Sequence, residues 1–108
     1  MTKQQISSIL SEIGNFSLNE VVDLKDKVQS IILASDECLY PDKNTRFEFH
    51  TKNSCELLLV YTGRETEDGT FIFKDDLPEY FIPFAAVVGI NMLTPFRIKE
   101  PYRLTQAV

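Results

Sequence analysis

The sequence predicts an α+β domain in which helices come first and an antiparallel sheet follows. Three observations support this class. Apolar residues recur at helical spacing in the first third of the chain. From Thr45 onward, short runs either alternate or are wholly apolar, which is typical of strands. The segment Tyr80–Leu93 contains no charged residue, so it should form the buried centre of the sheet.

The first helix should span residues 3–13. Thr2 and Gln5 have the spacing of a capping box, which satisfies free N–H groups at a helix start. Gly14 should end the helix, because glycine readily adopts the left-handed conformation found there. The apolar stripe of this helix consists of Ile6, Ile9, Leu10 and Ile13.

A second helix is predicted from Leu18 to about Ala34. Ser17 followed by Glu20 is a second capping box. The two helices, joined by about four residues, should form an αα-hairpin over residues 1–35 that covers the sheet. The apolar positions of the second helix are Val21, Leu24, Val28, Ile31 and Ile32.

About five short strands should follow as an antiparallel meander over residues 45–99. Asp68–Gly69 is a strong hairpin signal, and Pro83 should begin a turn that leads into the last core strand. Residues 100–108 should form a loose tail. The predicted strands are residues 45–51, 56–62, 70–74, 80–82 and 87–93, with a further one at 96–99.

The length of 108 residues suits a single domain, residues 1–108. A helix followed by short strands that curl into a strongly bent sheet is similar in order to SH3-like and Sm-like barrels. This likeness is one of architecture and implies a small β-barrel as one form of the sheet.

Several classes of protein do not fit the composition. The N-terminus has no apolar run of the kind found in signal peptides, and Tyr80–Leu93 is too short for a membrane-spanning helix. Two cysteines, Cys38 and Cys55, are too few for a disulfide scaffold and should be free thiols. We therefore expect a cytoplasmic protein. The net charge of −5 argues against nucleic acid as a partner.

No arrangement of residues predicts catalysis. His50 is the only histidine, and it should lie on the solvent face of a strand with Arg46 and Glu48. The spacing of Cys38, His50 and Cys55 matches no zinc-binding pattern, and no nucleotide-binding or hydrolase motif occurs. We expect neither enzymatic activity nor a metal or cofactor.

The most uneven feature of the sequence is its charge distribution. Residues 64–79 hold six acidic residues against two basic ones, which accounts for four of the five net negative charges. These carboxylates should flank one short strand, either as solvated turns that protect a sheet edge or as a docking face for a basic partner. This acidic ridge consists of Glu65, Glu67, Asp68, Asp75, Asp76 and Glu79.

The C-terminal segment is a second candidate surface. It could cover the open edge of the sheet or add a strand to a neighbouring subunit. Its apolar residues are Phe96, Ile98, Tyr102 and Leu104, and its basic residues are Arg97, Lys99 and Arg103.

These features favour a small acidic, non-catalytic regulator or inhibitor that binds a basic protein through the acidic ridge. Such proteins include those carried by phages and mobile elements. The alternative is a structural protein that forms a homo-oligomer through Tyr80–Leu93 and the C-terminal segment.

Overall fold

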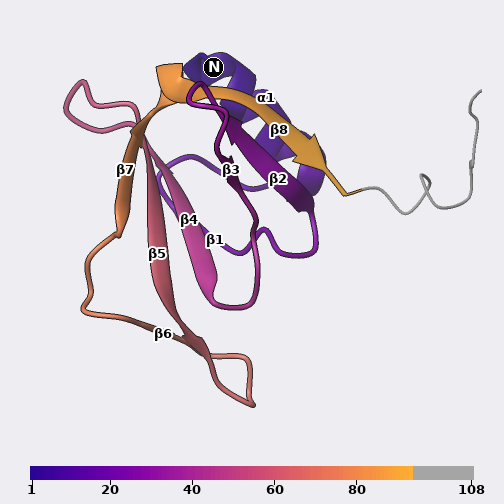
Figure 1. The fold of residues 1–108 in the computed structure, drawn as a ribbon, viewed down its shortest axis with the longest axis vertical. Coiled ribbons are helices and arrows are strands. Elements are labelled where there is room, and N and C mark those ends of the chain that lie inside the picture. The colour runs from indigo at the N-terminus through magenta and orange to yellow at the C-terminus, as the bar shows by residue number, and fades with distance from the viewer. Residues whose placement is uncertain (94–108) are drawn as a thin grey trace, which may run out of the picture.

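The computed structural model describes residues 1–93, which form one α-helix, one 3-10 turn and eight short strands (Figure 1). The predicted α+β class is confirmed. No helix within these residues has the length and hydropathy needed to cross a membrane. The elements are α1 (Lys3–Gly14), β1 (Val21–Val22), β2 (Val28–Leu33), β3 (Cys38–Leu39), β4 (Thr45–His50), β5 (Leu57–Glu65), β6 (Phe71–Phe73), β7 (Tyr80–Pro83), η1 (Phe84–Ala86) and β8 (Val87–Met92).

The capping box of α1 is confirmed. The Gln5 backbone N–H donates to Thr2 Oγ1 at 3.1 Å, and the Thr2 N–H donates to Gln5 Oε1 at 2.8 Å. The helix ends one residue later than predicted, because Asn15 rather than Gly14 takes the left-handed conformation, with φ 58°. Asparagine is among the few residues that tolerate this conformation.

The prediction of a second helix is wrong, and with it the prediction of a helical hairpin over residues 1–35. Residues 18–34 instead contain β1 and β2. Asn19 fixes β1 beside β4, since its N–H donates to the Phe49 carbonyl at 3.0 Å and its side chain forms two hydrogen bonds with Thr51. The β-branched residues of this segment suit a strand, and pairing with β4 and β8 outweighs the apolar spacing that also fits a helix.

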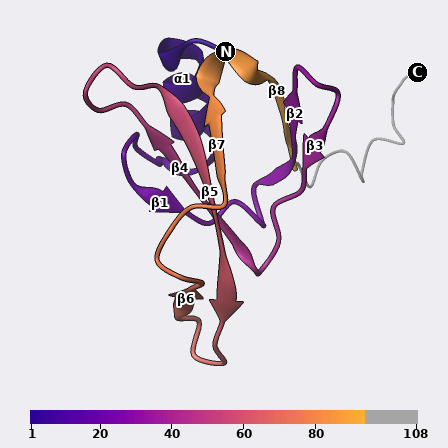
Figure 2. The same ribbon diagram turned by 60° about the vertical axis from the view of Figure 1, so that its left-hand side comes forward.

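The strands form two antiparallel sheets. One has the order β1-β4-β5-β6, with β7 also paired to β5, and the other has the order β3-β2-β8. Together they curl into a half-barrel (Figures 1 and 2). Consecutive strands β4, β5 and β6 pair as a meander predicts, but β8 returns to pair with β2, so the arrangement is not a simple five-stranded meander.

Strand β5 connects most of the first sheet. One edge pairs with β4 over residues 57–62, while the other edge pairs first with β7 and then with β6. The strand runs three residues beyond its predicted end, so Gly63 lies within the strand and not in the hairpin loop. A Cβ at Gly63 would stand 2.1 Å from the Ile72 carbonyl oxygen, so only glycine permits this close pairing of β5 with β6.

The core lies between α1 and the concave side of the sheets. The N-terminal ammonium donates to the carbonyls of Phe84 at 2.6 Å and Val87 at 2.5 Å, which fixes the start of α1 beside η1 and β8. The core residues are Ile6, Leu10, Val22, Leu24, Val28, Ile31, Leu33, Phe47, Phe49, Leu58, Val60, Phe84 and Val87.

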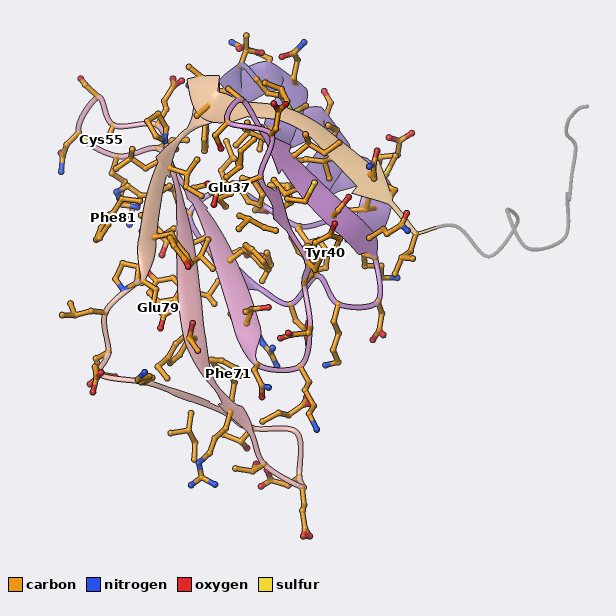
Figure 3. All side chains as sticks on the ribbon, viewed as in Figure 1. Glu37, Tyr40, Cys55, Phe71, Glu79 and Phe81 are labelled. Atoms are coloured by element: carbon orange, nitrogen blue, oxygen red, sulfur yellow. The ribbon has the colours of Figure 1, made fainter. Side chains whose placement is uncertain are left out.

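Tyr80–Leu93 is not the buried centre that its composition predicted. Phe84 and Val87 are buried, but Phe81 is 62% exposed and Val88 is 56% exposed. Figure 3 shows Phe81 projecting outward from β7. Both β7 and β8 are edge strands within residues 1–93, and the side chains on their outer faces are exposed because nothing in this part of the chain covers them. The strand predicted at 96–99, the tail at 100–108 and the C-terminal segment lie outside the described residues.

Candidate protein-binding surface

The acidic ridge lies on the β5–β6 hairpin and the loop that follows it. This hairpin extends from the lower end of the half-barrel in Figure 1. Glu65 ends β5, Glu67 and Asp68 lie at the hairpin tip, and the remaining three residues lie between β6 and β7. The six residues therefore lie along the hairpin and the loop that follows it, and their surroundings differ.

Glu65 belongs to an ion cluster with Asp23, Lys25 and Arg46. Lys25 Nζ lies 2.7 Å from Asp23 Oδ2 and 3.2 Å from Glu65 Oε2. Arg46 Nη2 lies 3.3 Å and 3.6 Å from the same two oxygens. Two positive and two negative charges balance, so Glu65 is used to attach the hairpin to the rest of the domain.

Asp23 and Lys25 of the ion cluster stay charged at neutral pH. Burial acts to raise the pKa of Asp23, but hydrogen bonds from Lys25 and the charge of Arg46 outweigh it and leave the pKa below its ordinary value. Hydrogen bonds to Asp23 and Glu65 raise the pKa of Lys25. Both partners are therefore ionised over the whole physiological range.

Arg46 is buried, which corrects its predicted place on a solvent face. Its residue surface is 6% exposed, and its guanidinium carbon lies 4.1 Å from the centre of the Phe71 ring. It also donates to the Thr45 carbonyl at 2.8 Å. Its partners come from the segment after β1 and from β5 and β6, so no local pattern in the sequence predicted the cluster. Figure 3 shows Phe71 at the base of the hairpin.

The other five ridge carboxylates are exposed, and among residues 1–93 none of them forms an ion pair. Hydrogen bonds from Thr66 Oγ1 and the Thr70 N–H lower the pKa of Asp68. Glu79 Oε2 accepts a hydrogen bond from Thr62 Oγ1 at 2.6 Å. Against the nearby Arg64 and Lys74, the five leave a surplus of three negative charges. The five are Glu67, Asp68, Asp75, Asp76 and Glu79.

A short loop holds Asp75 and Asp76 against β5. The Lys74 N–H donates to the Thr62 carbonyl at 2.8 Å, and the Glu79 N–H donates to the Val60 carbonyl at 2.7 Å. Between these ties both aspartates have positive φ, 61° and 54°. Aspartate is one of the side chains that visits this conformation at modest cost, so the tight loop can carry two carboxylates.

A chain of hydrogen bonds lies on the outer face of the sheet, beside the ridge. Tyr61 Oη donates to Glu48 Oε1 at 2.9 Å, and His50 Nδ1 lies 2.7 Å from Glu48 Oε2. Burial, together with the hydrogen bond to Glu48, raises the pKa of Tyr61 to about 12. His50 is thus tied to Glu48 and is only partly exposed, and the chain holds the Tyr61 ring in place.

Phe73 lines two pockets. One, of about 220 Å³, is lined by Val21, Tyr61, Phe73 and Asp76, and is named here the aromatic pocket. The other, of about 300 Å³, carries Arg64 and Lys74. Sequence reasoning missed both, because they depend on the pairing of β6 with β5 and, for the aromatic pocket, on β1 joining the same sheet through β4.

Residues 1–93 contain no group of three or more histidine, cysteine, aspartate or glutamate side chains arranged to hold a metal ion. Cys38 and Cys55 are exposed free thiols on separate segments. His50 is engaged with Glu48, as described above.

Comparison of the chain with protein-family models, with curated proteins and with solved structures found no match.

Proposed function

We propose that this protein is a small acidic, non-catalytic regulator or inhibitor that docks a basic partner protein through the acidic ridge. The observation that carries the proposal is the set of five exposed carboxylates that form no ion pair within residues 1–93. Clustered charges of one sign speed association with an oppositely charged partner and select against partners of like charge.

The contrast with Glu65 supports this function. The domain contains buried and half-buried cations that could pair with carboxylates, and it uses them on Glu65 and Asp23. The exposed five are left to solvent at the tip of the hairpin and in the loop that follows it, where a partner can reach them. We propose cytoplasmic action, in keeping with the exposed free thiols of Cys38 and Cys55.

The test compares two variants in affinity capture from a lysate. The ridge variant replaces the five exposed carboxylates with their amides. The control variant does the same to five exposed carboxylates elsewhere, so the net charge is matched. We expect a stoichiometric basic protein to bind the wild type and the control but not the ridge variant; equal capture by all three would rule out the ridge. The control positions are Glu12, Glu20, Asp26, Glu37 and Glu56.

We also propose that the half-barrel is a small barrel of the SH3-like or Sm-like kind. The support is the order of elements, in which a helix precedes bent strands and η1 links β7 to β8. The pairing of β8 back to β2 is what would close such a barrel. An experimental structure of the full chain in which the two sheets share a continuous ladder would establish this, and two separate sheets would refute it.

A second candidate function is self-assembly, favoured by the two unpaired edges of β7 and β8. Each pairs with one strand only within residues 1–93, and Phe81 and Val88 are exposed there. Exposed apolar edge strands readily pair with another chain. Light scattering over a hundredfold range of concentration tests this. A constant monomer mass would exclude assembly, while a larger mass that V88K or F81K reduces would support it.

A further inference from the structure

The aromatic pocket differs in chemistry from the rest of the ridge. Tyr61 from β5 and Phe73 from β6 form two of its walls, with ring centroids 5.4 Å apart and the rings nearly perpendicular. Val21 from β1 forms a third, and the Asp76 carboxylate stands at its margin. Its volume, about 220 Å³, accepts a planar group of several heavy atoms, since a water molecule occupies about 30 Å³ of liquid.

The Tyr61 wall is held in one orientation. Its hydroxyl donates to Glu48, which is itself held by His50. The hydroxyl is therefore already hydrogen-bonded to Glu48, and the ring is the part of Tyr61 that is left to contact a ligand. A fixed, neutral aromatic ring binds a cation through its electron-rich face.

The lining contains a negative charge without a positive one. Among the described residues Asp76 has neither an ion pair nor a hydrogen bond to another side chain, and the pocket lining includes no basic residue. Two aromatic rings beside one carboxylate are chemically complementary to a single cationic side chain.

The same strand already shows this mode of binding. Phe71 lies two residues before Phe73, and the guanidinium carbon of Arg46 lies 4.1 Å from the centre of its ring. The carboxylates of Asp23 and Glu65 form ion pairs with the same guanidinium. The aromatic pocket repeats these parts, a ring and a carboxylate, without an arginine among its lining residues.

From this geometry we infer that the aromatic pocket receives one arginine side chain of the basic partner, with its guanidinium against the Tyr61 and Phe73 rings and paired to Asp76. Arginine fits better than lysine because its planar group stacks on rings while offering two parallel N–H donors to a carboxylate. The inference rests on the proposed function and names the residue of the partner that enters this site.

The experiment titrates full-length protein with N-acetyl-arginine amide and follows the Tyr61 and Phe73 ring resonances by NMR. The lysine and citrulline amides are the comparison probes, citrulline being neutral and of the same shape. We expect saturable shifts at the two rings with arginine, at least about tenfold weaker binding with lysine, and none with citrulline. Equal binding of citrulline or no saturable shift would overturn the inference.

Two variants locate the binding. D76N should weaken arginine binding about tenfold, whereas D68N, an exposed ridge carboxylate outside the pocket, should leave it unchanged. Equal loss in both variants would mean a diffuse charge effect and no arginine site. Ring shifts that appear in R97Q/R103Q without any probe would show that the chain's own arginines fill the pocket, which would also overturn the proposal.

The inference and the proposed function can fail separately. If the ridge variant loses the basic partner but D76N retains it, docking through the ridge stands and the arginine site falls. If the arginine amide binds the pocket but the ridge variant still captures the partner, the proposed function falls.

Discussion

Phe71 and Phe73 lie two residues apart on β6, on the same face of the sheet, yet their surroundings differ. Phe71 is covered by Arg46, whose charge is balanced by Asp23 and Glu65. Phe73 borders a pocket whose carboxylate, Asp76, forms no ion pair within residues 1–93. At Phe71 a ring and two carboxylates share an arginine of the same chain, whereas no arginine lines the pocket that holds Phe73 and Asp76.

This difference separates the ion cluster that attaches the hairpin from the pocket proposed to bind an arginine. The base of the hairpin is held by an ion cluster whose four charges are already paired with one another. The carboxylates at its tip and in the following loop are exposed, so replacing them should change the stability of the fold little. Mutations at the base should therefore alter stability, and mutations at the pocket should alter binding.

The largest effect on stability should come from G63A, which disrupts the pairing of β5 with β6 that positions both Phe71 and Phe73. A Cβ at this position would meet the Ile72 carbonyl oxygen at 2.1 Å, so β6 must move. We expect the free energy of unfolding to fall by about 2 to 3 kcal/mol in urea titration. The matched control is G89A, whose Cβ would meet only the Ile32 side chain at 3.7 Å. Similar losses in both variants would contradict the argument.

The next largest effect should come from R46M, which removes a cation of the ion cluster and leaves the lining of the aromatic pocket unchanged. Asp23 and Glu65 lose a cation that is 7% exposed, while their own side chains remain partly in water. We expect a loss of about 2 kcal/mol, less than for a fully buried pair. R64Q removes an exposed arginine from the same hairpin and should change stability by less than about 0.5 kcal/mol. Thermal unfolding compares the two.

Acid should loosen the base of the hairpin. The pKa of Asp23 is lowered on folding, so its contribution to stability is present above its ordinary value of 3.8 and is lost as the pH falls through the lower folded value. The Phe71 ring resonance should broaden in this range. D23N should remove this pH dependence, and an unchanged profile in D23N would refute the assignment.

The smallest effect should come from D76G, and its sign should be opposite. Asp76 has φ 54°, a conformation that glycine adopts without the penalty of a side chain. We expect the free energy of unfolding to rise by about 0.5 to 1 kcal/mol while arginine binding weakens about tenfold, as in D76N. A stability gain without loss of binding would show that this carboxylate is not used for recognition.

The features predicted correctly depend on neighbours in the chain. The capping box of Thr2 and Gln5, the alternating strand at Thr45–His50 and the hairpin signal at Gly69 all act within a few residues. The concentration of acid at residues 64–79 is also visible in the sequence, but only the structure distinguishes Glu65 from the rest.

The failures involve contacts between distant segments. Val28–Leu33 has apolar residues that fit a helix or a strand, and its pairing with β8, about 60 residues later, decides between them. Arg46 resembles a solvent-facing residue until β1 and β5 bring two carboxylates to it. Gly63 resembles a loop glycine until the register with Ile72 shows why no side chain fits.

The backbone ties at both ends of the loop between β6 and β7 bear on how this protein can diversify. The Lys74 and Glu79 N–H groups are fixed to carbonyls only two residues apart on β5, at Thr62 and Val60. Lengthening a loop whose ends are already closed costs only about 0.6 kcal/mol for each doubling. Insertions and substitutions between these ties can therefore change the length and charge of this loop while the sheet beneath them keeps its register.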